Sequence, residues 1–415
     1  MYVGIEAMSF AVPRRYLELT DLARARGVEP EKYTAGLGCR RMAIADPGED
    51  TVALAATATK RLMERTGLDP RRIGMLVAGT ETGVDHSKAV ASYVQGALGL
   101  PRSMRVFDTQ HACYGGTAAL MATAGWLASM ARVEQVGVVV MADIARYQPR
   151  TAGEPTQGAG AVALLVSRNP RLLKLDLEVS GVFSTDVHDF WRPLGRREAL
   201  VDGHYSIDCY LEAIAGSWRE WRDAALARGL LRRQPGTYPC EMLPRILFHV
   251  PFGKMARKAH ARVRLADIED AGRRLDAGAL AAETAAASGW FARQVAPALD
   301  LCAEIGNSYT ASLYLSLLGL LHKQAGELAG QRIGLFSYGS GCVSEFFSGV
   351  VGPDAAEAVA AMDVDEVLAQ RERIDVAEYE RLYGLSPDTP PAEVPVRGGF
   401  RFTGLDQFKR RYAAG

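Results

Sequence analysis

The chain has 415 residues, of which 48% are hydrophobic and 23% are charged, as in an ordinary globular protein. Lys and Arg together number 48, and Asp and Glu together number 48, so the net charge is zero and nothing global favours nucleic acid or an anionic membrane surface. The first residues lack the pattern of a secretion signal, no apolar stretch has the length of a membrane span, and the six cysteines show no C-x-x-C spacing. We therefore expect a cytoplasmic protein with free thiols, no zinc site and no membrane contact.

Short apolar runs alternate with helical patterns along the chain, which is typical of βαβ units and predicts an α/β fold. In chain order, we expect strands at 3–12, 73–80, 136–143, 161–167, 246–250 and 333–338. Between and after them, we expect helices at 51–66, 87–98, 115–130, 207–228, 280–300, 309–326 and 376–383. The first half, 1–168, is rich in strands, and the second half, 169–415, contains a long insertion from about 180 to 240.

The first candidate site residue is Cys113, which lies between a short apolar run and the helix expected at 115–130. The N-terminus of a helix lowers the pKa of a thiol and favours the nucleophilic thiolate. The paired Gly115 and Gly116 are expected to leave room for a substrate beside the sulfur. The alternative is a buried, inert cysteine, which is how we interpret the other five.

Two further candidates stand at the ends of apolar strands. Glu81 follows the strand expected at 73–80, where partial desolvation raises a carboxyl pKa toward values suited to a general base. Asp85 competes for that role, and an exposed loop acid is the alternative for Glu81. His249 stands at the end of the strand expected at 246–250, and a core histidine bonded to the backbone is its alternative.

The densest basic run of the chain follows His249 and comprises Lys254, Arg257, Lys258, Arg262 and Arg264. Lys254 and Lys258 are four residues apart and therefore share one helical face. The run is either a solvated face or a site for phosphate or an acidic protein.

Three further stretches are interpreted as pocket walls. The segment from Glu154 to Gly160 has the glycines of a phosphate loop, but it lacks the Gly-Lys-Ser/Thr ending and precedes a strand. Asn307 stands just before an apolar helix, where helix capping is the alternative. The turn Gly339-Ser340-Gly341 follows a strand and lets the backbone approach a ligand closely.

Taken in order, these segments resemble the 3-hydroxy-3-methylglutaryl (HMG) synthase family of the thiolase superfamily. The resemblance covers nearly the whole chain as far as Gly349, and its most specific parts are Ala112-Cys-Tyr-Gly-Gly-Thr-Ala118, Phe248-His-Val-Pro-Phe-Gly-Lys-Met255, Asp189-Phe-Trp-Arg-Pro193 and Phe336-Ser-Tyr-Gly-Ser-Gly341. It implies an α/β protein with a duplicated, thiolase-like α-β-α-β-α layered fold that works as a homodimer.

The resemblance also implies roles for individual residues. Cys113 would carry an acetyl group as a thioester, with Glu81 and His249 as general acid/base residues. Substrate contacts would come from Tyr147, Thr156, Ser206, Lys254, Lys258, Asn307 and Ser340. No cofactor is bound permanently, because the substrates arrive as thioesters of coenzyme A or of phosphopantetheine. The chemistry is consistent, since a condensation without decarboxylation must remove a methyl proton and needs a carboxylate base.

Two branches of the family are open. One makes HMG-CoA from acetyl-CoA and acetoacetyl-CoA for mevalonate. The other forms β-branches on polyketides, moving an acetyl group from a donor acyl carrier protein to a β-ketoacyl chain on an acceptor carrier protein. The segments 4–8, 109–113, 341–346 and 408–412 favour the polyketide branch, which is our expectation.

The polyketide branch also gives the basic run a role. The run is expected near the mouth of the substrate tunnel, where it would meet either the phosphates of coenzyme A or the phosphopantetheine arm and acidic helix of a carrier protein. Salt weakens both attractions, and the width of the run favours the carrier protein. A non-catalytic thiolase-fold binding partner is a third possibility. The presence of Cys113, Glu81 and His249 together argues against it.

Overall fold

The computed structural model describes residues 2–273, 276–360, 362–391 and 398–415. Its main feature is a nine-stranded sheet with the order β11-β12-β13-β8-β1-β7-β6-β4-β5. The first half of the chain supplies β1 (Val3–Ala11), β4 (Ile73–Gly79), β5 (Arg105–Thr109), β6 (Val136–Ile144) and β7 (Ala159–Arg168). The second half supplies β8 (Leu173–Ser184), β11 (Ile246–Phe248), β12 (Arg332–Gly339) and β13 (Val343–Val351).

The two halves of the sheet repeat one arrangement. In the first half, β1 is antiparallel to β7, β7 is antiparallel to β6, and β6 is parallel to β4. In the second half, β8 is antiparallel to β13, β13 is antiparallel to β12, and β12 is parallel to β11. The halves meet where β1 pairs with β8 at Gly4 and Ile5. The fold is therefore duplicated, as expected.

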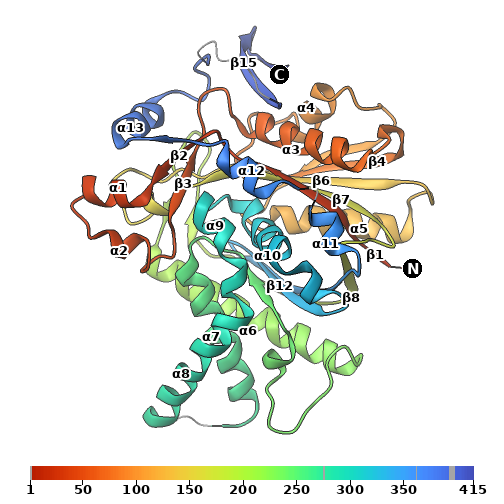
Figure 1. Cartoon of the computed structure of the whole chain (residues 1–415), viewed down its shortest axis with the longest axis vertical. Helices are drawn as coiled ribbons and strands as arrows, with labels where there is room; N and C mark the ends of the chain where they lie inside the picture. The colour runs from red at the N-terminus through yellow and green to blue at the C-terminus, as the bar shows by residue number, and fades with distance from the viewer. Residues whose placement is uncertain (1, 274–275, 361, 392–397) are drawn as a thin grey trace.

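Helices cover both halves and fill the space between them (Figure 1). On the outer face of the first half lie α3 (Thr51–Thr66) and α4 (Val90–Ala97), and on that of the second half lie α6 (Gly203–Ala227) and α7 (Gly253–Asp270). Between the halves lie α5 (Gly115–Ser129) and α10 (Ser312–Leu328), whose apolar side chains share one core with both halves of the sheet. The layers are thus α-β-α-β-α, which confirms the expected fold class.

Local sequence signals explain where these helices begin and end. The Asp50 side chain accepts a hydrogen bond from the backbone N–H of Ala53 and caps α3, and Gly67 ends that helix in the left-handed conformation. A single helix expected at 280–300 is instead α8 (Ala277–Gln294) followed by α9 (Asp300–Ile305). Pro297 lies between them and cannot continue a helix.

The insertion expected at about 180 to 240 is part of the layered body rather than an appendage. Its first residues complete β8, and α6 packs on β8 and β13. Trp218 and Trp221 of α6 are fully buried. Between β8 and α6 a short hairpin is formed by β9 (Phe190–Trp191) and β10 (Leu200–Val201).

The remaining elements pack at the edges of this body. A three-stranded sheet contains β2 (Arg15–Glu18), β3 (Arg41–Ile44) and β14 (Glu372–Ile374), and the C-terminal hairpin contains β15 (Phe400–Asp406) and β16 (Lys409–Ala414). The short helices are α1 (Leu19–Ala25), α2 (Pro30–Tyr33), α11 (Ala355–Ala360), α12 (Val364–Ala369) and α13 (Val376–Gly384). None of the helices in the described ranges is long and apolar enough to cross a membrane.

Candidate active site

Cys113 lies in the turn between β5 and α5, as the sequence predicts. The preceding residue, Ala112, has a φ of 41°, a left-handed conformation that is costly for a residue with a side chain. Tyr114 then forms the N-cap of α5. The turn therefore holds the thiol at the end of a central helix, where two layers of the fold meet.

The paired glycines serve packing rather than substrate access. A Cβ on Gly116 would lie 2.6 Å from Met141 Cγ and 2.9 Å from the Thr310 carbonyl oxygen. A Cβ on Gly115 would lie 3.0 Å from the Thr109 carbonyl oxygen. The expectation that they leave room for a substrate is wrong, because protein atoms occupy that space. They allow α5 to approach β6 and the turn before α10.

The Cys113 thiol donates a hydrogen bond to Glu81, with Sγ 3.1 Å from Oε1. Burial and the neighbouring Asp143 raise the pKa of Glu81 to about 8, although the thiol and Arg192 oppose the shift. Burial and the charge of Glu81 also raise the pKa of Cys113 well above its usual value. The expectation that the helix end favours a free thiolate is therefore wrong. The thiol keeps its proton and has a carboxylate beside it to accept that proton.

Asp85, the competing candidate for the base, is excluded by its position. It is exposed, and its Oδ1 accepts hydrogen bonds of 2.8 Å from the backbone N–H groups of Ser87 and Lys88. These bonds lower the pKa of Asp85, so it is a turn-stabilising carboxylate.

Asp143, at the end of β6, organises the site and was not recognised from the sequence. Its side chain is fully buried and accepts hydrogen bonds from the Glu81 backbone N–H (2.9 Å) and from the hydroxyls of Thr80 (2.8 Å), Thr82 (2.7 Å) and Thr310. It thereby ties the end of β4 to the start of α10. The signal in the sequence was an acid at the end of an apolar strand, the pattern that identified Glu81.

Tyr147 and Asn307 form an aromatic and polar wall beside the thiol. The Tyr147 ring packs edge-on against Phe190 and Tyr309, in a buried cluster that includes Cys113. The Asn307 Nδ2 amide lies 3.5 Å from the Tyr147 hydroxyl, and its Oδ1 accepts a 2.9 Å bond from the Tyr309 backbone N–H. Asn307 therefore holds the turn before α10 while its amide faces Tyr147.

His249 reaches the same region from the second half of the fold. It follows β11 directly, is 3% exposed, and its backbone oxygen accepts a 2.8 Å bond from the Tyr210 hydroxyl. Burial lowers its pKa to about 3, so the ring is neutral at working pH. The neighbouring strand β12 ends at Gly339, where an added Cβ would lie 2.7 Å from the backbone nitrogen of Tyr114. The end of β12 thus meets the turn that carries Cys113, and β11, which leads to His249, pairs beside it.

Asp189 connects Ser206 to the glycine turn that contains Ser340. The fully buried Asp189 accepts hydrogen bonds from the Ser206 hydroxyl (3.5 Å), the Tyr338 hydroxyl (2.6 Å) and the Gly341 backbone N–H (2.9 Å). It fixes the glycine turn against the start of α6. Asp189 lies in a segment that the sequence singled out, but its role as a shared acceptor was not predicted.

Thr156 stays at the edge of this arrangement. Its hydroxyl donates a 2.8 Å bond to the Gly153 carbonyl, and its own carbonyl accepts a 2.9 Å bond from the Asn307 backbone N–H. The segment that resembles a phosphate loop is therefore a short turn that supports Asn307.

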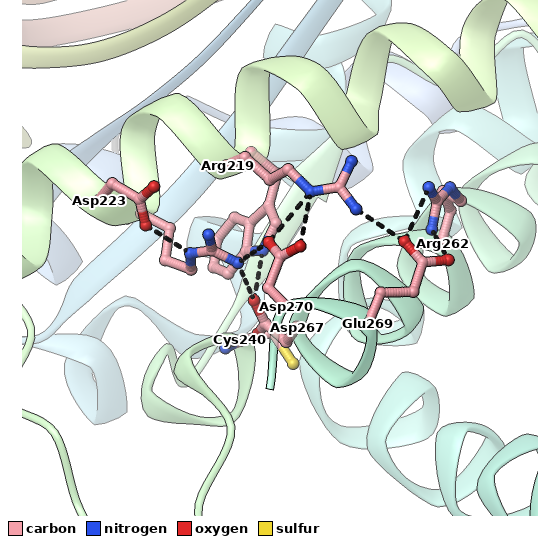
Figure 2. Close-up of polar contacts among 9 residues, drawn as sticks. Arg219, Asp223, Cys240, Arg262, Asp267, Glu269 and Asp270 are labelled. Atoms are coloured by element: carbon pink, nitrogen blue, oxygen red, sulfur yellow. Dashed lines mark hydrogen bonds and ion pairs between the residues drawn. The ribbon is translucent and has the colours of Figure 1, made fainter. Parts of the chain in front are cut away.

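The basic run divides into two parts along α7. Lys254 and Lys258 lie on its first turns; Lys254 is exposed and Lys258 is half-buried. Arg262 instead pairs with Glu269, which also contacts Arg219 (Figure 2). Arg264 is 7% exposed and lies between the carboxylates of Glu241 and Glu283. The expected five-cation surface is therefore wrong for Arg262 and Arg264, because Arg262 is neutralised by Glu269 at the surface and Arg264 is buried between two carboxylates.

Comparison with known proteins agrees with this geometry. Residues 1–170 match the family model for the N-terminal part of hydroxymethylglutaryl-coenzyme A synthase, and residues 173–289 and 273–386 match the model for its C-terminal part. The chain belongs to the HMG-CoA synthase family. Hydroxymethylglutaryl-CoA synthase of Enterococcus faecalis is 36% identical over 389 residues, which cover 94% of this chain and 93% of that protein.

Two solved structures place the chain within this HMG-CoA synthase family. The structure described as MvaS in complex with 3-hydroxy-3-methylglutaryl coenzyme A is 61% identical, with a TM-score of 0.97, covering 100% of this chain and 99% of that one. The curacin biosynthetic pathway HMG synthase in complex with a holo donor carrier protein is 30% identical, with a TM-score of 0.85 and full coverage of both chains. The resemblance and the thiolase-like fold expected from the sequence are confirmed. The chain is a carbon–carbon bond-forming, acyl-transferring enzyme.

Proposed function

We propose that this HMG-CoA synthase condenses acetyl-CoA with acetoacetyl-CoA, the alternative to our sequence-based expectation. The contact of the Cys113 thiol with Glu81 in a buried site carries the proposal, because it supplies a nucleophile and a base in one place. The 61% identity to a structure that holds HMG-CoA supports coenzyme A as the carrier. So does the loss of Arg262 and Arg264 from the exposed basic surface.

Glu81 serves as the proton carrier in each step. It takes the thiol proton as Cys113 attacks acetyl-CoA and gives it to the departing coenzyme A sulfur. The free carboxylate then removes a methyl proton from the acetyl group, and the resulting enolate attacks the ketone of acetoacetyl-CoA. Protonated Glu81 returns its proton to the new alkoxide.

His249 and water complete the reaction. Among the described residues, none hydrogen-bonds to the His249 ring, so its neutral N–H is free to donate to the ketone oxygen and stabilise the charge that develops there. Water finally attacks the Cys113 thioester. Glu81 accepts a water proton and returns it to the sulfur, which restores the starting pair.

The other predicted site residues are proposed to hold the thioester arms. Tyr147 packs in the cluster that contacts Cys113, and Asn307 lies beside Tyr147. Ser340 lies in the glycine turn that Asp189 holds, and Ser206 and Thr156 support the walls through Asp189 and Asn307. Lys254 and Lys258 lie on the outer turns of α7, where exposed ammonium groups suit the phosphates of coenzyme A.

A carrier-protein role is the second candidate. In it, a donor acyl carrier protein delivers the acetyl group and an acceptor carrier protein holds the β-ketoacyl chain, as in polyketide β-branching. The curacin HMG synthase bound to a donor carrier protein favours this candidate. Lys254 and Lys258 would then contact phosphopantetheine.

Parallel steady-state kinetics tests the choice. We expect kcat/KM for acetyl-CoA and acetoacetyl-CoA to equal or exceed that for the same acyl groups on phosphopantetheinylated carrier proteins. A clear preference for both acyl carrier proteins would reverse the choice, and Cys113→Ser should abolish turnover with either set.

The enzyme is further proposed to work as a homodimer. Strand β5 forms one edge of the large sheet, and its Phe107 is 36% exposed. An open edge strand is suited to pair with a second copy. Light scattering after size-exclusion chromatography should give the mass of two chains, and a monomer would contradict the proposal.

A further inference from the structure

Four arginines that the mechanism does not use line one cavity. Arg410 pairs with Asp50 and Asp388, and the other three are Arg146, Arg192 and Arg197. The cavity has a volume of about 240 Å³ and lies between the start of α3, the loop after β4, the segment around β9 and β10, and the end of α13. Its walls include Thr82 and Gly83, the residues directly after Glu81, together with Arg146, Arg192 and Arg197. The cavity is therefore next to the catalytic base.

The three guanidinium groups have no carboxylate partner. The Nε and Nη2 atoms of Arg197 are buried without any hydrogen bond. In the part of the chain that the structure describes, Arg146 and Arg192 also form no ion pair, although Glu198 lies near Arg146. Burial and the nearby Arg197 lower the pKa of Arg146 to about 10, so these cations oppose each other. Buried guanidinium donors are costly unless something pairs with them.

The acidic groups on the walls of the same cavity cannot fill this need. Each of them already has a donor. Asp46 pairs with Arg401, and Asp50 and Asp388 both pair with Arg410, which also lines the cavity. Glu49 accepts hydrogen bonds from the backbone N–H groups of Arg14 and Asp46. Among the described residues of the lining, the charges without an ion-pair partner are therefore the guanidinium groups of Arg146, Arg192 and Arg197.

We propose that Arg146, Arg192 and Arg197 form a binding site for a small carboxylate or phosphate group beside the catalytic base. The planar fork of arginine matches both groups with paired hydrogen bonds. Arg192 is close enough to act on the charge of Glu81, so the site and the reaction centre are electrostatic neighbours. The proposal goes beyond the proposed function and holds for either thioester carrier.

Calorimetric titration of the full-length enzyme tests the site directly. The probes are inorganic phosphate and free 3-hydroxy-3-methylglutarate, and the variants are Arg197→Gln and Arg192→Gln. We expect the wild type to bind at least one probe and each variant to bind it about tenfold more weakly, as for the loss of a charged hydrogen bond. Arg196→Gln is the matched control, because Arg196 is exposed and not on the cavity wall, and it should bind as the wild type does.

A second titration separates the two sources of the anion. If the group is the carboxylate of the product, Arg197→Gln also weakens HMG-CoA binding while binding of coenzyme A is unchanged. If it is a separate small anion, only binding of the free probes is weakened. Both results support the site.

Equal binding by wild type and both variants, or no binding by the wild type, overturns the proposal. Dissociation of a dimer in Arg197→Gln without anion binding also overturns it, since a partner subunit would then fill the cavity. Arg192 is half-buried on a surface segment, so Arg192→Gln decides the matter if Arg197→Gln fails to fold.

Discussion

The Cys113 thiol donates a hydrogen bond to the Glu81 carboxylate across 3.1 Å. This contact raises the pKa of Cys113 and lowers that of Glu81, which burial and Asp143 raise. Position along the chain predicted both residues, because each follows an apolar strand. The direction of the thiol pKa could not be predicted in the same way. It depends first on the burial of the thiol and then on a carboxylate that lies 32 residues away in sequence, and only the packing of β4 against α5 shows both.

Replacing Glu81 with Gln should separate the two half-reactions. Condensation should fall by about 100-fold or more, the range of general-base contributions. Acetylation of Cys113 should fall less, because raising the pH ionises part of the Cys113 thiol. The thiolate can then attack acetyl-CoA without a base to remove its proton. Single-turnover labelling with acetyl-CoA, followed by product formation, measures both steps. Asp85→Asn is the matched control and should retain near-normal rates; a larger loss there than in Glu81→Gln would show that the base is assigned wrongly.

The pH dependence should report the raised pKa of Glu81. The ionised base is required, so kcat/KM should rise with pH and level off above about 8. Asp143→Asn removes a charge that raises this pKa, while its amide oxygen still accepts hydrogen bonds. The rise should therefore move to lower pH in that variant. A pH profile measured for both enzymes checks the shift, and a profile that stays in place would argue against Asp143 as the cause.

The elements bring the site together through strand ends and one close helix contact. Most strands and helices could be predicted from apolar runs, as for β4, β6 and α3. Strand β13 was not predicted, because its residues 344–349 include polar and glycine positions that only the pairing with β12 and β8 explains. The glycines of α5 were interpreted as substrate space for a similar reason, since the atoms that crowd them come from distant segments.

Gly116→Ala should therefore destabilise the protein, since its Cβ would meet Met141 and the backbone of Thr310. Overpacking of this kind costs about 1–3 kcal/mol, and the shift of α5 should also lower activity. Gly125→Ala on the same helix is the matched control, because nothing lies within 4 Å of its added Cβ. That variant should be neutral or slightly more stable, as Ala favours a helix over Gly. Calorimetric unfolding measures both, and equal melting temperatures for the two variants would contradict the packing account.

At the scale of the whole molecule, a chain with zero net charge keeps a small exposed basic patch at the start of α7. The sequence predicted a wider one, because spacing alone does not show that Glu269 of α7 pairs with Arg262, or that Glu241 and Glu283 pair with Arg264. The fold class and the family could nevertheless be recognised from the sequence. The thioester carrier could not, since both branches place the same residues at the reacting atoms.

Lys258→Ala should raise KM for acetyl-CoA several-fold and leave kcat nearly unchanged, because it removes a charge near the phosphates and not at the reacting atoms. The effect should shrink at high salt. Acetyl-pantetheine lacks the nucleotide phosphates and serves as the control, so its KM should not change. An equal rise with acetyl-pantetheine would place Lys258 elsewhere in the site.

The account rests on Cys113 as the atom that carries the acetyl group from one coenzyme A thioester to another. Peptide mass spectrometry after rapid quenching measures this directly. The enzyme is incubated with acetyl-CoA, sampled, and then given acetoacetyl-CoA. We predict an acetyl group on the peptide that contains Cys113 and its loss as HMG-CoA forms in equal amount. An acetyl group on another cysteine, or one on Cys113 that acetoacetyl-CoA does not convert into HMG-CoA, would contradict the account.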